Sequence, residues 1–193
     1  MRLAEIERGD SIRSRLLIRL ISMMLRARLP DAARVAFYHR DFAGHELGAW
    51  TQRAMRGPSA WTVGERELMA ALVGQWNSNI FCVGAHSAIA IRGMDRSLVD
   101  AAMAEYHTAP ISDQLRATLV FLEKMTRQPG QLTDEDARTA LAAGVTRDQL
   151  VDASAVAAVF NIITRYADAL DFTIPSHEEY EKSARMLFKR GYA

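Results

Sequence analysis

The chain lacks several features that define large classes of proteins. Its 193 residues contain one cysteine, Cys82, which excludes an intrachain disulfide framework and a zinc site of the multi-cysteine type. There is no G-x-G-x-x-G segment, no Walker loop and no G-x-S-x-G segment, which disfavours nucleotide and flavin enzymes. Basic and acidic residues nearly cancel, and the formal net charge of +1 argues against a dedicated nucleic-acid binder.

Strand patterns are also missing. No run alternates polar and apolar residues over enough positions to form a strand, whereas apolar residues recur at helical spacing along most of the chain. Pro, Gly and short polar clusters divide these runs into segments without a low-complexity linker. The sequence therefore predicts a single all-α domain of antiparallel helices joined by short loops.

The first thirty residues form a segment of their own. Residues 11–29 contain five arginines and no acidic residue, with apolar side chains at helical spacing. Arg19 interrupts the apolar run, so the segment resembles neither a secretory signal nor a membrane span of about 20 apolar residues. We expect residues 1–30 to hold an amphipathic helix used in packing or subunit contact rather than lipid binding, and residues 31–193 to form the main domain of a cytoplasmic protein.

Helix boundaries can be predicted from capping residues. Pro30 and Asp31 open a helix that runs towards Phe42. Thr62 with Glu65 has capping-box spacing, and the helix it begins should end near Trp76. Three residues with strong N-cap preference, Asn77–Asn79, precede an apolar run to residue 91. Further N-caps are expected at Ser112 and Thr146, while Thr133 opens an acid-rich helix start and Pro175–Ser176 stops the long helix before a last amphipathic one.

The residues around Cys82 point to chemistry. Cys82 and His86 are four positions apart, so on a helix they share a face. A cysteine in the first turn of a helix lies near the positive end of the dipole, which favours the thiolate. Glu67 on the preceding helix could orient His86 or relay its proton. By itself this pattern also fits a buried cysteine and a satisfied histidine in a helical core.

The wider segment strengthens the chemical interpretation. Residues 56–90, RGPSAWTVGERELMAALVGQWNSNIFCVGAHSAIA, resemble the carboxymuconolactone decarboxylase and alkyl hydroperoxidase D-like superfamily, in particular its peroxidase-related branch. YHRDFAGHELGAW upstream, LTDEDARTALAAGVTRDQLVDASAVAAVFNIITRYADALDFTIP downstream and the terminal FKRGY are similar to the same family. The resemblance covers roughly residues 30–193 and implies an alkyl hydroperoxidase D-like helical bundle. It implies catalytic roles for Cys82, His86 and Glu67.

One departure from the family pattern concerns the resolving cysteine. The family motif has a Glu followed twelve residues later by C-x-x-C-x-x-x-H, and Asn79 stands where the first cysteine would be. The resemblance implies that Cys82 attacks the peroxide, but no second cysteine can resolve it within the chain. Three outcomes stay open: a one-cysteine peroxidase recycled by an external thiol, an intersubunit disulfide, or a retired or repurposed site. Asn79 itself could cap the helix or bind a substrate oxygen.

Other polar residues are weaker candidates for the site. Asn161, Arg165 and Asp168 share a helix face and could line a cleft, although a structural hydrogen-bond network is the favoured interpretation. The family usually has an Asn where this chain has Thr164. His45 is a candidate for the mouth of the pocket by resemblance alone. No histidines or carboxylates have metal-ligand spacing, and we expect neither a metal nor a cofactor.

Two classes of function follow from these residues. The first is an enzyme: a thiol-dependent hydroperoxide reductase in oxidative-stress defence, in which the pKa of Cys82 should lie below that of a free thiol, or a non-redox decarboxylase-like or lactone-isomerase-like enzyme in which His86 and Glu67 transfer protons. The second is a catalytically retired binding protein in which Cys82 is buried with a raised pKa. The expected partners are a small-molecule substrate, an external thiol if the protein is a peroxidase, and further copies of the chain in a trimer or hexamer. We expect no nucleic acid and no membrane span.

Overall fold

The structure is a computed structural model that describes residues 1–38 and 44–192. These residues form α-helices and one short 3₁₀ helix, without a strand, which confirms the predicted all-α fold. The helices are α1 (Ala4–Arg8), α2 (Ile12–Leu25), α3 (Asp31–Phe37), α4 (His45–Arg56), α5 (Val63–Trp76), α6 (Ile80–Ala90), α7 (Arg96–Glu105), α8 (Asp113–Arg127), η2 (Pro129–Gln131), α9 (Asp134–Ala142), α10 (Arg147–Leu170) and α11 (His177–Arg190).

Side-chain caps begin most of the long helices where the sequence predicts them. Thr62 and Glu65 make a reciprocal capping box at the start of α5, and Asn79 accepts a hydrogen bond from a backbone amide at the start of α6. The predicted caps at Ser112 and Thr146 are present, and Thr133 and Ser176 make capping boxes at the two helix starts expected there. Local sequence therefore decides where α5, α6 and α8–α11 begin.

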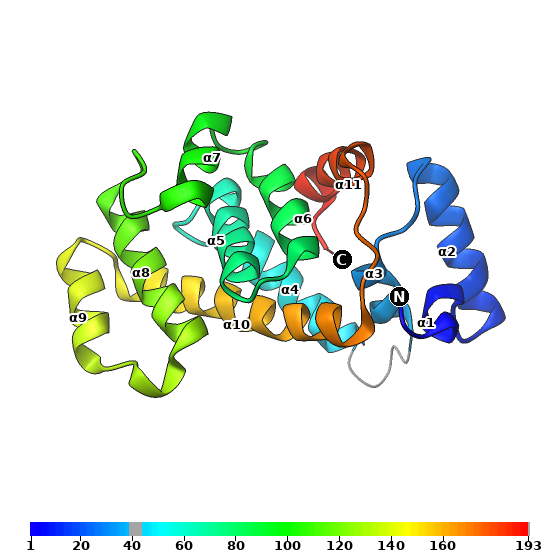
Figure 1. The fold of residues 1–193 in the computed structure, drawn as a ribbon, viewed down its shortest axis with the longest axis horizontal. Helices are drawn as coiled ribbons and strands as arrows, with labels where there is room; N and C mark the ends of the chain where they lie inside the picture. Colours follow the sequence, from blue (N-terminus) through cyan, green and yellow to red (C-terminus); the bar gives the residue numbers. More distant parts are fainter. Residues whose placement is uncertain (39–43, 193) are drawn as a thin grey trace.

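The helix pair α5 and α6 lies at the centre of the molecule, and α10 passes across it, below the pair in Figure 1. α5 is buried on almost every side: ten of its fourteen residues are inaccessible to solvent, including Leu68, Leu72 and the charged Glu67. α10 crosses α4, α5 and α8, while α11 covers α6. A charged residue in so apolar a helix must find partners inside the protein, because an unpaired buried charge is costly.

Two segments differ from the expectation. Tyr38 has an extended backbone and caps α3 after Phe37, while the predicted continuation towards Phe42 falls in residues 39–43, outside the described part of the chain. α7 was not predicted. It lacks a side-chain cap at Asp95 and is held in place by burying Val99 and Ala102, which a local pattern does not reveal.

α10 is the one helix in residues 1–38 and 44–192 that is long and apolar enough to cross a membrane. Its buried face, which includes Val156, Val159 and Phe160, belongs to the main core, and it packs against α4, α5, α8 and α9. These contacts are those of a central core helix.

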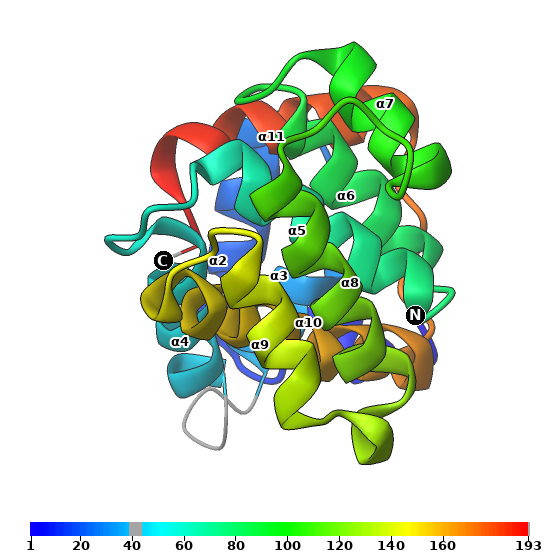
Figure 2. The same cartoon turned by 90° about the vertical axis from the view of Figure 1, so that its left-hand side faces the viewer.

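α2 lies at the end of the molecule opposite α8 and α9 (Figures 1 and 2). Ser11 caps it, and Ile18 is its buried contact with the rest of the chain. The opposite face is apolar yet exposed, with Ile12 76% and Met23 70% accessible to solvent. This face has no covering element in the single chain that the structure describes.

Candidate functional site

The candidate site is built on the α5–α6 helix pair. Asn77 ends α5. Ser78, which has a left-handed backbone at φ 57°, then turns the chain into α6. A Cβ added at Gly74 would lie 2.9 Å from the Cβ of Cys82, closer than real Cβ contacts occur, so glycine allows the two helices to pack tightly here. This packing brings Glu67 on α5 level with His86 on α6.

Glu67 and His86 form a direct hydrogen bond in the protein interior. His86 Nδ1 lies 2.7 Å from Glu67 Oε2, and both residues are buried. A carboxylate accepts this bond from the Nδ1–H of the ring, and in that tautomer Nε2 is the nitrogen that can act as a base. The Phe160 ring meets the imidazole edge-on at 4.3 Å between centroids and fixes its tilt. This geometry is that of a base oriented by a carboxylate.

Two further residues hold Glu67, and the sequence did not single them out. Arg56, from the end of α4, approaches Oε1 at 2.7 Å. The Tyr192 hydroxyl donates to the same carboxylate, 2.9 Å from Oε1 and 3.0 Å from Oε2. Burial, and then the negative charge of Glu67, raises the pKa of Tyr192 well above that of an ordinary phenol. The signal that could have found Tyr192 was its place in the FKRGY segment.

Cys82 lies in a different environment from the pair. Its side chain is fully buried beside Phe81, Ala167 and Phe172. Burial, followed by the nearby charge of Asp168, raises the pKa of the Cys82 thiol to about 12. At neutral pH the resting group is therefore a thiol and not the thiolate that its position in the first turn of α6 suggested. A fully buried sulfur also offers no surface for an intersubunit disulfide in this conformation.

Asn79, at the position of the missing cysteine, connects two helices. Its Oδ1 accepts from the backbone N–H of Cys82 at 2.9 Å, which caps α6. Its Nδ2 donates to Asp168 Oδ1 at 2.6 Å and to the Thr164 carbonyl at 3.4 Å, both on α10. Asn79 thus has the capping role considered from the sequence, and its amide is occupied by these contacts.

Asn161 and Arg165 lie on α10 and form a separate hydrogen-bond network. Asn161 Oδ1 accepts from Asn77 at 3.0 Å, and its Nδ2 donates to Thr126 on α8 at 3.1 Å. Arg165 donates to the Asn161 carbonyl at 2.7 Å. These bonds connect α10 with the end of α5 and with α8, whereas Asp168, predicted for the same network, accepts from Asn79 instead.

The remaining candidates lie apart from this cluster. His45 begins α4 with an exposed side chain, and its ion contact is Glu46 at 3.6 Å. Among residues 1–38 and 44–192, no group of three or more His, Cys, Asp and Glu side chains is arranged to hold a metal ion.

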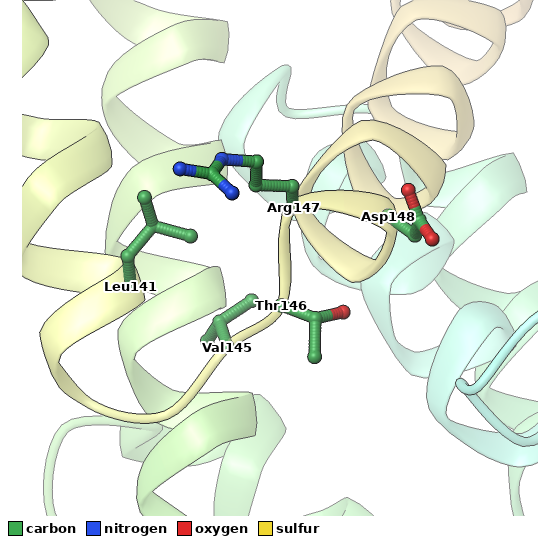
Figure 3. A pocket seen from close by; sticks show the side chains of 5 residues that line it. All are labelled: Leu141, Val145, Thr146, Arg147 and Asp148. Carbon is green, nitrogen blue, oxygen red and sulfur yellow. The ribbon is translucent and has the colours of Figure 1, made fainter.

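A surface pocket at the junction of α9 and α10 is also separate from the site (Figure 3). It is lined by Leu141, Val145, Thr146, Arg147 and Asp148. Arg147 precedes Phe160, the neighbour of His86, by thirteen residues on α10. At 1.5 Å per residue that is roughly 20 Å along the helix.

An all-α bundle with a buried Glu–His pair, and with a cysteine one helical turn before the histidine, is what the sequence resemblance predicts for an alkylhydroperoxidase D-like (AhpD-like) protein. Comparison with solved structures supports this fold. The chain is similar to an uncharacterized peroxidase-related protein from Silicibacter sp. TM1040, at 23% identity and a TM-score of 0.74 over 89% of this chain and 88% of that one. It is similar at 22% identity and a TM-score of 0.73 to an alkylhydroperoxidase AhpD core protein from Ralstonia eutropha JMP134, over 91% and 90% of the chains.

A third similar structure is the debrominase Bmp8, at 18% identity and a TM-score of 0.71 over 91% of this chain and 94% of that one. A cysteine-to-alanine variant of Bmp8 has been crystallised with 2,3,4-tribromopyrrole. No protein-family model matches the chain, and no curated protein is similar enough in sequence to count as a relative. These likenesses establish that the chain shares the fold of these proteins.

Proposed function

We propose that the chain is a one-cysteine, thiol-dependent reductase of organic hydroperoxides. The observation that carries the proposal is the 2.7 Å hydrogen bond between Glu67 and His86, which orients a base one helical turn after the chain's cysteine. Residues four apart on a helix have Cβ atoms about 5–6 Å from each other, so His86 and Cys82 share a face of α6, and the proposal requires His86 Nε2 to reach the thiol proton when substrate binds. Glu67 would stabilise the imidazolium that forms.

The first half of the reaction oxidises Cys82. His86 Nε2 accepts the thiol proton as the sulfur attacks the terminal oxygen of the hydroperoxide, and the oxygen–oxygen bond breaks. The imidazolium then protonates the leaving alkoxide. Cys82–SH and ROOH become Cys82–SOH and ROH, with the sulfur oxidised by two electrons and the peroxide reduced by two. Because the raised pKa keeps Cys82 protonated at rest, deprotonation must accompany substrate binding.

The second half requires thiols from outside the chain. Asn79 occupies the resolving position, and Cys82 is the only cysteine. One external thiol therefore condenses with the sulfenic acid to give a mixed disulfide and water. A second external thiol releases Cys82–SH and leaves as the external disulfide.

The similar structures support thiol chemistry on this fold. Two are named as peroxidase-related or AhpD proteins, and the Bmp8 complex with a brominated pyrrole was obtained with a cysteine replaced. Both reductions can use a thiolate as the nucleophile: it attacks the terminal oxygen of a hydroperoxide or the bromine of an aryl bromide. The proposal therefore extends to halogenated aromatic compounds as test substrates.

A second candidate function is proton transfer without the thiol, as in a decarboxylase-like enzyme. The raised pKa of Cys82 favours it, because a thiol that stays protonated acts as an apolar neighbour of the pair. His86 would then be the general acid and base, with Glu67 as its partner. The two candidates differ in whether activity needs the sulfur.

Steady-state turnover separates them. Wild-type protein is supplied with an organic hydroperoxide and a small dithiol, and peroxide loss is compared with that of Cys82→Ser and His86→Gln. We expect both variants to lose activity, and His107→Gln, which alters an exposed histidine, to keep it. Turnover that persists in Cys82→Ser contradicts thiol chemistry. No peroxide consumption by wild type contradicts the peroxidase proposal and favours the non-thiol enzyme or the retired binding protein.

We also propose that the chain assembles with copies of itself in the cytoplasm. The exposed apolar face of α2 supports this proposal. The charge distribution also supports it: residues 11–29 are strongly basic, whereas the net charge of the whole chain is only +1, so the remaining residues together carry a net negative charge. A basic, apolar helix from one copy is complementary to the acidic remainder of another.

A further inference from the structure

The strongest feature that the proposed chemistry does not use is the segment after α11. Gly191 follows this helix and turns the chain inward, so that Tyr192 enters the protein beside Glu67 and His86. The Tyr192 ring stacks near the imidazole, with an angle of 27° between the planes and 6.2 Å between centroids. A residue far from the α5–α6 pair in sequence thus forms part of its wall.

The segment is held by specific contacts with α4. The Tyr192 backbone N–H donates to Gln52 Oε1 at 2.6 Å, and the Arg56 guanidinium lies 5.1 Å from the centre of the Tyr192 ring. Arg56 also donates to the Leu187 carbonyl near the end of α11 at 2.9 Å. Gly191 has φ 76°, and a Cβ there would lie 2.3 Å from Gln52 Oε1, so only glycine fits this turn.

The phenol is placed to act on the carboxylate rather than on the substrate. Its hydroxyl is within 3.0 Å of both Glu67 oxygens and 3.3 Å from His86 Nδ1. A buried phenol beside a carboxylate stays protonated, so it remains a donor. With Arg56 it fixes the plane of the carboxylate and takes a share of its negative charge, which limits how strongly Glu67 holds the His86 proton.

We infer that Tyr192 is a positioning residue that sets the orientation and basicity of His86 through Glu67, with the Gly191 turn as its anchor. This inference rests on the proposed role of His86 as a base. It assigns no contact between Tyr192 and the substrate. Removal of the hydroxyl should leave the carboxylate more negative towards the ring, so the protonated imidazole should be favoured.

The test is Tyr192→Phe, which keeps the ring and removes the donor. The matched control is Tyr106→Phe, because Tyr106 also donates to a carboxylate, Glu123, at 2.5 Å but outside the site. We expect the His86 imidazole proton resonance to shift in Tyr192→Phe, whereas Tyr106→Phe leaves it unchanged. In turnover, kcat/KM should fall about tenfold, and the acidic limb of the pH profile should move to higher pH.

A second variant covers the case in which Tyr192→Phe does not fold. Gly191→Ala keeps every site side chain but strains the turn, and it should reproduce the His86 spectral change. Unchanged His86 signals in a folded Tyr192→Phe variant would overturn the inference. Failure of the proposed function is distinguishable, because a wild-type protein without turnover still reports the effect of Tyr192 on His86 by NMR.

Discussion

Glu67 and Cys82 are both buried, yet their surroundings differ. Glu67 receives hydrogen bonds or ion contacts from Arg56, His86 and Tyr192. Cys82 lies among apolar side chains, and its charged neighbour Asp168 repels a thiolate. The single chain therefore holds an oriented Glu67–His86 pair and a buried Cys82 that stays a protonated thiol at neutral pH.

The charge of Asp168 gives a prediction at this scale. Asp168→Asn removes the charge, while its amide oxygen can still accept from Asn79. Because burial is the larger cause, we expect the pKa of Cys82 to fall but to stay above its ordinary value. Alkylation by iodoacetamide, followed over pH by mass, measures the change. An unchanged or slower rate in Asp168→Asn would contradict the role assigned to this charge.

The Cys82 thiol also affects stability in alkali. Burial raises its pKa from an ordinary value of 9.0 to about 12 in the folded chain, so between these values the unfolded chain loses a proton that the folded chain keeps. The free energy of unfolding should then fall with rising pH, by up to about 1.4 kcal/mol per pH unit. Urea unfolding of wild type and Cys82→Ala from about pH 8 to pH 10 checks this, because the alanine variant should show a shallower slope. Equal slopes would show that Cys82 titrates normally.

At the scale of elements, the sequence predicts helix starts from capping residues but does not predict contacts between residues that are distant in sequence. Thr62 and Asn79 predict the starts of α5 and α6, because a side-chain cap acts within one turn. The i, i+4 spacing places Cys82 and His86 on one helix, and the family resemblance adds Glu67. Arg56 and Tyr192 could not be found in this way, because their contacts with Glu67 depend on how α4 and α11 pack.

Restoring the missing cysteine tests the geometry of the α6 start. Asn79→Cys recreates C-x-x-C and removes the cap, at a cost of about 1 kcal/mol in the free energy of unfolding. After one equivalent of organic hydroperoxide, we expect an intact mass lower by two hydrogen atoms, as an internal disulfide forms. Asn79→Ser keeps a capping oxygen without a thiol and should form none. A stable sulfenic acid in Asn79→Cys would contradict the placement of the two sulfurs.

At the scale of the whole molecule, α2 is the least covered part of the chain that the structure describes. Ile18 anchors it, whereas Leu16, Leu20 and Met23 are exposed. Composition and spacing predict the amphipathic helix. They do not show that its apolar face stays exposed, because this depends on which other helices pack against it in the folded chain. The proposed assembly of several copies would cover this face.

This assembly predicts a change in size when α2 is altered. Leu16→Glu with Leu20→Glu places acidic charges on an exposed face, so the fold of one chain should be preserved while association weakens. Sedimentation velocity should show an assembly for wild type and smaller species for the double variant. Ile174→Glu, at another exposed apolar position, serves as the control. A wild-type monomer, or a double variant that sediments like wild type, would contradict the proposal.

The most direct test of the central claim is the rate at which an organic hydroperoxide oxidises Cys82 in a single turnover, followed by intact mass from about pH 5 to pH 9. The account predicts oxidation faster than that of a free thiol. It also predicts a loss of roughly 10²–10⁴-fold in His86→Gln and no loss in His107→Gln. Oxidation no faster than that of a free thiol, or equal rates with and without His86, would contradict activation of Cys82 by the Glu67–His86 pair.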